Sequence, residues 1–269
     1  MAGNIDWRRL KNSLHQVAKL EFGEGDEALA RMRYVAGLLE DVVPLCGETT
    51  KTKKMLLRLG TVLVKTDTSK ILVPVCPDYA HDGEKYTFNG LNGGISLLTQ
   101  KHIAFLRSLF GILPEFQVLL LMADHEADDA ALVRTTGKTK EEFLELLDSS
   151  IEQTRMAVAP FGWQVERMTS VFPSLVQDER EIYQWISNEP KFQQRIVTDT
   201  IKRMGMYAKY GNLGVEEMRE RTARTSAQYM ALGRFAAREG FLICNHTTTN
   251  LSWYLQTEAA VLHNPIEVY

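Results

Sequence analysis

The stretch Phe116–Ala123 reads FQVLLLMA, and it is the clearest strand signal in the sequence. A continuous apolar run of this length is typical of a strand that is covered on both faces, as in a parallel sheet. Three further short apolar runs follow the same pattern, at Ile71–Cys76, Trp163–Met168 and Phe241–Asn245. Segments with helical spacing separate the four runs. Strands that alternate with helices predict a parallel α/β sheet with right-handed connections.

Apolar residues at helical spacing predict the remaining elements. The expected helices span about 4–43 (two helices), 95–110, 139–158, 178–239 (broken near Gly205 and at Gly211–Gly214) and 251–262. Pro74 interrupts the first strand run, and because proline has no amide hydrogen it favours an edge or a strand end there. We therefore expect one Rossmann-like α/β domain over 1–269, with a mainly parallel sheet of about five strands flanked by helices and an N-terminal helical segment at 1–50.

Composition narrows the class of protein. The chain has 269 residues, of which 45% are hydrophobic and 24% charged, as in an ordinary globular protein. It has neither an apolar run of about 18 residues nor an apolar stretch behind the first positive charges, so we expect no membrane span and no secretory signal. Three scattered cysteines favour a reduced, cytoplasmic setting. The net charge of −3 argues against a protein that coats nucleic acid, and DNA is not an expected partner.

Polar residues follow the predicted strands at the points where a site is expected. In open α/β sheets, ligands bind beyond the carboxyl ends of the strands. The residues at these positions are Cys76, Asp78, Asp124, His125, Glu126, Asn245 and His246. Strand ends are loops, and loops are polar in any protein, so a single cluster fits a plain loop equally well. Clusters after several strands together favour a substrate-binding site.

Four residues have side chains suited to catalysis. Tyr254 and Glu258 are four residues apart and share a helix face, so they predict an acid/base pair or, alternatively, a surface glutamate beside a half-buried tyrosine. Ser96 follows Gly93-Gly94 and is either a nucleophile or an ordinary helix-start serine. Cys76 is either a reactive thiolate at the rim of the sheet or an inert, buried thiol.

Several enzyme classes are disfavoured by missing motifs. No G-x-G-x-x-G follows a strand, and neither a P-loop nor a G-x-S-x-G elbow occurs, so we expect no nicotinamide, nucleotide or other cofactor and no α/β serine hydrolase. The histidines include no zinc-type pair. Asp124, Glu126, Asp128 and Asp129 suit Mg²⁺, but acids are also ordinary at the start of a helix, so no metal is expected.

Two short elements resemble motifs of the tRNA-dependent cyclodipeptide synthases. Gly94-Ile95-Ser96 is similar to the element whose serine accepts an aminoacyl group, and Tyr254-Leu-Gln-Thr-Glu258-Ala, with Pro265 beyond it, is similar to the late-helix pair. The chain resembles a distant member of that family, and the resemblance extends to its fungal, arginine-using branch. It implies a Rossmann fold like the catalytic domain of class I aminoacyl-tRNA synthetases. The H-I-G-H and K-M-S-K-S signatures are absent, as this family's use of preactivated aminoacyl-tRNA implies.

The resemblance implies an aminoacyl transferase that forms a dipeptide or cyclodipeptide through an aminoacyl-enzyme, with aminoacyl-tRNA as partner. In the family the acceptor serine directly follows the first strand, where this chain has Cys76, so an ester on Ser96 and a thioester on Cys76 both stay open. Glu258 would take or relay the amine proton, and Tyr254 would orient that amine.

Two other functions remain compatible with the same residues. A metal-assisted transferase or hydrolase would use Asp124, Glu126 and His246, and a third alternative is a non-catalytic small-molecule-binding protein. The sequence does not identify the substrate amino acid; arginine is one candidate, because the carboxylates of Asp124, Glu126 and Asp128 suit a guanidinium.

Most basic residues of this chain lie outside the stretch that matches the helix with which the cyclodipeptide synthases bind tRNA. The family's tRNA-binding helix is rich in arginine and lysine, whereas the matching stretch Thr139–Arg155 is rich in acids. Basic residues instead cluster in two other regions, where a solvated helix face is the alternative for each of them. They are Lys51, Lys53, Lys54 and Arg58, and then Arg195, Lys202, Arg203, Lys209, Arg219, Arg221, Arg224, Arg234 and Arg238.

Overall fold

The computed structural model describes most of the chain. The described residues are 5–46, 50–65, 69–75, 80–82, 85–87, 93–113, 116–128, 130, 133, 138–206, 214–246, 252–259 and 261–264. Cys76 and Asp78 lie outside them, as do the side chains of Glu126 and His246.

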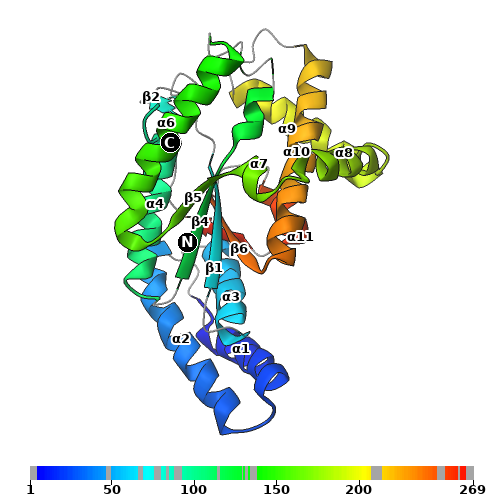
Figure 1. The fold of residues 1–269 in the computed structure, drawn as a ribbon. Helices are drawn as coiled ribbons and strands as arrows, with labels where there is room; N and C mark the ends of the chain where they lie inside the picture. The colour runs from blue at the N-terminus through cyan, green and yellow to red at the C-terminus, as the bar shows by residue number, and fades with distance from the viewer. Residues whose placement is uncertain are drawn as a thin grey trace.

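Helices and strands alternate along these residues (Figure 1). The helices are α1 (Trp7–Phe22), α2 (Asp26–Cys46), α3 (Thr50–Lys65), α4 (Leu97–Phe110), η1 (Asp124–Asp128), α6 (Lys140–Val158), η2 (Ala159–Phe161), α7 (Met168–Val171), α8 (Leu175–Ile186), α9 (Pro190–Met206), α10 (Val215–Arg238) and α11 (Ser252–Glu258). The strands are β1 (Ser69–Val75), β2 (Ala80–Asp82), β3 (Lys85–Thr87), β4 (Phe116–Met122), β5 (Gln164–Arg167), β6 (Phe241–His246) and β7 (Val261–Asn264).

The main sheet is parallel, with strand order β5-β4-β1-β6-β7. The predicted α/β class is therefore confirmed, and each of the four predicted apolar runs contains one of its strands. β1 lies in the middle, paired with β4 along its whole length and with β6 from Lys70 to Leu72. Pro74 is the last but one residue of β1, beyond the recorded pairing with β6, which fits the expectation of a strand end.

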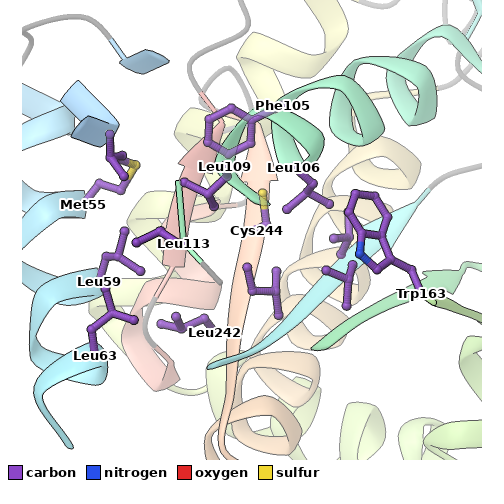
Figure 2. Packing of buried hydrophobic residues seen from close by; sticks show 14 of the residues in the cluster. Met55, Leu59, Leu63, Phe105, Leu106, Leu109, Leu113, Trp163, Leu242 and Cys244 are labelled. Carbon is purple, nitrogen blue, oxygen red and sulfur yellow. The ribbon is translucent and has the colours of Figure 1, made fainter. Parts of the chain in front are cut away.

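Alternate residues of the central strands enter two separate hydrophobic cores. Ile71, Val73 and Val75 of β1 pack on the side of α1–α4 and α6, where Figure 2 shows helix residues meeting Leu242 and Cys244 of β6. Leu72 packs on the opposite side, among residues of α7–α11. Both faces are covered by helices, which explains why these strands are apolar at almost every position.

The N-terminal helices form a group below the sheet in Figure 1. α3 was not predicted as a helix, and the helical segment therefore extends beyond residue 50, to Lys65. Arg31 of α2 binds the end of α3, donating from Nη2 to the Leu63 carbonyl at 2.5 Å and from Nε to the Val64 carbonyl at 3.2 Å. A basic side chain that satisfies the last carbonyls of a neighbouring helix fixes the position of both.

The predicted helix over 251–262 is wrong at its carboxyl end. α11 ends at Glu258, and residues 261–264 form β7 against β6, with Val261 opposite Ile243. Val261 is fully buried. Pairing with the otherwise open edge of β6 satisfies backbone groups that a longer helix would leave exposed, so tertiary context overrides the helical pattern. The β2–β3 hairpin was also not predicted.

Candidate active site

The strand order defines where a ligand is expected to bind. From β1 the chain builds β4 and β5 on one side and then returns to build β6 and β7 on the other. The strand order thus reverses between β1 and β6, and in open α/β sheets ligands bind in the crevice beyond the carboxyl ends at such a point. Asn245 and His246 end β6 at this edge, and the Asn245 side chain is buried.

Asp124 is the second residue beyond the end of β4, at the same edge, but its carboxylate binds the neighbouring helix α7. Oδ1 accepts a hydrogen bond from the Thr169 amide at 3.0 Å, and Oδ2 accepts one from the Thr169 hydroxyl. Asp124 thereby fixes the first turn of α7 to the end of β4. His125 is half-buried in η1. Among the described side chains, no three potential metal ligands come together.

Ser96 is the N-cap of α4. Its Oγ accepts a hydrogen bond from the Thr99 amide at 3.1 Å and lies 2.7 Å from the Thr99 hydroxyl. Two serines of α6 fix the preceding loop, because Ser149 and Ser150 donate to the carbonyls of Gly93 and Gly94 at 2.8 Å. Ser96 therefore makes the contacts of an ordinary helix-start serine. The loop before it is held in place by α6.

Tyr254 is fully buried between α9, α10 and α11. Its hydroxyl donates to Asp199 Oδ2 at 3.3 Å, a long hydrogen bond. The pKa of Tyr254 is raised to about 12, chiefly by burial and also by the nearby Asp199 carboxylate, while a hydrogen bond with Ser226 and the charge of Arg195 oppose the increase. The phenol is therefore protonated at neutral pH and is a hydrogen-bond donor, not a base.

Asp199 is the residue of this site that the sequence analysis missed. Its side chain is 1% exposed, and Oδ2 also accepts from Arg195 Nε at 3.0 Å. Oδ1 is buried and has no hydrogen-bond partner among the described residues. A buried polar atom of this kind calls for an explanation beyond packing. The sequence did contain a signal, because Phe192, Ile196 and Asp199 follow helical spacing, which puts a carboxylate on an apolar face.

Glu258 has a different partner from Tyr254. Its Oε2 accepts from Arg234 Nε of α10 at 3.1 Å, and its side chain is 22% exposed. The backbone of α11 approaches α10 closely here, because a Cβ on Gly233 would lie 2.9 Å from Glu258 Cβ and 3.1 Å from the Leu255 carbonyl. The two residues share a helix face, as expected, but no contact joins the phenol to the carboxylate in the described part of the chain.

A pocket of about 540 Å³ lies between α8, α9 and α10. Its size is that of a small-molecule site, and Arg219 donates across it to Gln193 at 2.8 Å. Of the residues singled out from the sequence, its lining contains Arg219, one of the clustered basic residues, and none of the predicted catalytic or substrate-binding residues. The lining residues are Tyr183, Ser187, Gln193, Ile196, Glu216, Glu217, Arg219, Glu220 and Ala223.

Comparison with known proteins adds no family to this description. No family model matches the chain, and no curated protein or solved structure matches it either. In the part of the chain that the structure describes, no helix is both long and apolar enough to cross a bilayer.

Proposed function

We propose that this protein is an aminoacyl transferase, which uses aminoacyl-tRNA to form a dipeptide or cyclodipeptide through an aminoacyl-enzyme. The observation that carries the proposal is the reversal of strand order between β1 and β6. The acceptor candidates Cys76 and Ser96 follow β1, whereas Tyr254 and Glu258 follow β6. Both groups of residues therefore leave the sheet beside one crevice, in a Rossmann-like strand order.

The chemistry assigns one role to each residue. Ser96, or Cys76 in its place, attacks the ester carbonyl of the aminoacyl-tRNA and keeps the aminoacyl group while the tRNA hydroxyl leaves with a proton. The amine of a second aminoacyl group then attacks this ester or thioester. Glu258 accepts the amine proton, and the phenol oxygen of Tyr254, whose own proton is donated to Asp199, accepts a hydrogen bond from that amine and orients it.

The N-cap position of Ser96 does not exclude it as the acceptor. An N-cap hydrogen bond contributes about 1 kcal/mol to stability. The free energy lost when Ser96 gives up this bond during the reaction is therefore small compared with the activation free energy that enzymes remove, which is roughly 8 kcal/mol or more. The resulting ester oxygen still accepts hydrogen bonds.

The test is intact-mass analysis after incubation with mixed aminoacyl-tRNAs. Replacing Glu258 by Gln keeps the shape of the side chain but removes the base, so the adduct should accumulate and product formation should fall by about 10²–10⁴-fold. Glu239→Gln is the matched control, because Glu239 also pairs with an arginine at 3.1 Å but does not lie on α11. It should leave both the adduct and product formation unchanged.

Three substitutions identify the acceptor. Ser96→Asn keeps an N-cap side chain but removes the nucleophile, and it should abolish the adduct if Ser96 is the acceptor. Cys76→Ala should abolish the adduct if the thiol is the acceptor. Ser108→Ala, on an exposed serine of the same helix α4, should leave the adduct intact. No adduct on the unaltered protein with any aminoacyl-tRNA would refute the proposed function and favour the binding-protein alternative.

A further inference from the structure

Three aromatic rings form a row across α8, α9 and α11, which lie with α10 on one side of the molecule in Figure 1. Trp185 meets Phe192 edge-on with 4.9 Å between ring centroids, and Phe192 meets Trp253 edge-on at 5.7 Å. Trp185 is 43% exposed and Trp253 is partly exposed, whereas Phe192 is buried between them. Two tryptophans are thus fixed at a surface by one buried ring.

Cations lie on both tryptophans. The Arg234 guanidinium is 5.9 Å from the ring centroid of Trp185, and Lys191 Nζ and the Arg195 guanidinium are 5.5 and 5.4 Å from that of Trp253. We call these five residues the tryptophan surface. A cation within about 6 Å of an aromatic face is attracted to it, and both kinds of group are then held in place together.

The acidic partners of these arginines lie deeper in the protein than the arginines do. The Arg195 side chain is 33% exposed against 1% for Asp199, and Arg234 is 48% exposed against 22% for Glu258. Lys191 is exposed and forms no ion pair with an acid among the described residues. Each ion pair therefore turns its positive end toward solvent, so that an approaching anion meets the guanidinium first.

We propose that the tryptophan surface binds single-stranded RNA, namely the unpaired 3′ end of the tRNA substrate; the choice of RNA rests on the proposed function. Exposed tryptophans stack on bases of any sequence, and adjacent cations neutralise the phosphates between them. A stacked base is held more strongly than a cation over an exposed ring, so a base displaces Lys191 from the ring toward a phosphate. Trp253 precedes Tyr254 in α11, which brings the bound 3′ end beside the proposed site.

The experiment measures binding of labelled, uncharged tRNA by fluorescence anisotropy over a series of salt concentrations. Lys191→Ala should weaken binding and lower the slope of log K against log salt by about 1, because one phosphate contact is lost. Trp185→Ala should weaken binding about tenfold or more through lost stacking. Lys11→Ala is the matched control, because Lys11 lies 5.9 Å from the Trp7 ring on α1, away from this surface, and it should change neither quantity.

The outcomes separate this inference from the proposed function, because uncharged tRNA undergoes no transfer. Equal effects of Lys11→Ala and Lys191→Ala would overturn the inference, as would equal binding of tRNA that lacks its unpaired 3′ end. Competition by polyglutamate as effective as that by a single-stranded oligoribonucleotide would also overturn it, in favour of an acidic protein partner. Loss of tRNA binding in Lys191→Ala and Trp185→Ala, without any adduct on the unaltered protein, supports the surface and refutes the transferase.

Discussion

Replacement of Tyr254 by phenylalanine tests the buried phenol directly. At neutral pH the variant loses the hydrogen bond to Asp199 and leaves that carboxylate with Arg195 as its partner. Hydrogen bonds to charged groups contribute about 1.5–3 kcal/mol, and at 3.3 Å this one belongs near or below the lower limit. We therefore expect the free energy of unfolding to fall by about 1–2 kcal/mol at pH 7.

Alkaline pH should reduce this difference between the two proteins. The pKa of Tyr254 is about 12 in the folded protein, against the ordinary tyrosine value of 10.0. Between these values the unfolded chain releases the phenolic proton while the folded chain keeps it, so stability that is present below pH 10 is lost as the pH rises toward 12. At pH 11 the release of this proton should lower the free energy of unfolding of the unaltered protein by about 1.4 kcal/mol. The phenylalanine variant has no phenol and should lose none of this free energy.

The assay is urea unfolding followed by circular dichroism at pH 7, 9, 10 and 11 (about one unit apart where the effect arises) for both proteins. Tyr34→Phe, on an exposed tyrosine of α2, shows what replacing a phenol does at a surface. The free-energy difference between the unaltered protein and Tyr254→Phe should shrink, or change sign, between pH 9 and 11. A difference that stays constant over this range would refute the description of Tyr254 as a buried, protonated donor.

Two further predictions concern packing around the site. Gly233→Ala should destabilise the protein by up to about 2 kcal/mol, because overpacking against the Leu255 carbonyl costs about 1–3 kcal/mol and the better helix propensity of alanine returns about 1 kcal/mol. Gly37→Ala is the control, because the new Cβ on α2 meets open space; it should stabilise the protein by about 0.5–1 kcal/mol in the same urea assay. Thr169→Ala should lower the unfolding free energy by about 1–3 kcal/mol because Asp124 loses a donor, whereas Thr169→Ser should keep most of the stability, and equal values for the two would contradict the hydrogen bond to Asp124.

The central strands were predictable because their environment is uniform. A strand covered on both faces is apolar at nearly every position, and this property is visible in Phe116–Met122 without any knowledge of its neighbours. The start of α6 was predictable for a local reason as well. Thr139 accepts a hydrogen bond from the Glu142 amide, and the Glu142 side chain accepts one from the Thr139 amide, so the sequence itself contains both halves of the cap.

Elements that depend on distant partners could not be predicted in this way. Residues 261–264 form a strand because β6 offers them an edge, and that edge is set by residues about twenty positions earlier in the chain. Position 254 illustrates the same limit for the site. The sequence indicates that Tyr254 and Glu258 share a helix face, but it does not show that Asp199 of α9 and Arg234 of α10 provide their partners.

The number of hydrogen-bond partners distinguishes Asp124 from Asp199, which the sequence alone does not. Asp124 has both oxygens bound by Thr169, so packing and capping account for it completely. Asp199 is more deeply buried than Asp124, but one of its oxygens has no hydrogen-bond partner among the described residues. A buried carboxylate with one oxygen unpaired lowers stability unless a further group binds it. An amine or guanidinium that reached Asp199 would find an acceptor already aligned by Arg195 and Tyr254. Unpaired hydrogen-bonding capacity therefore indicates a site at α9 and α11 more strongly than at the end of β4, where the acids first suggested one.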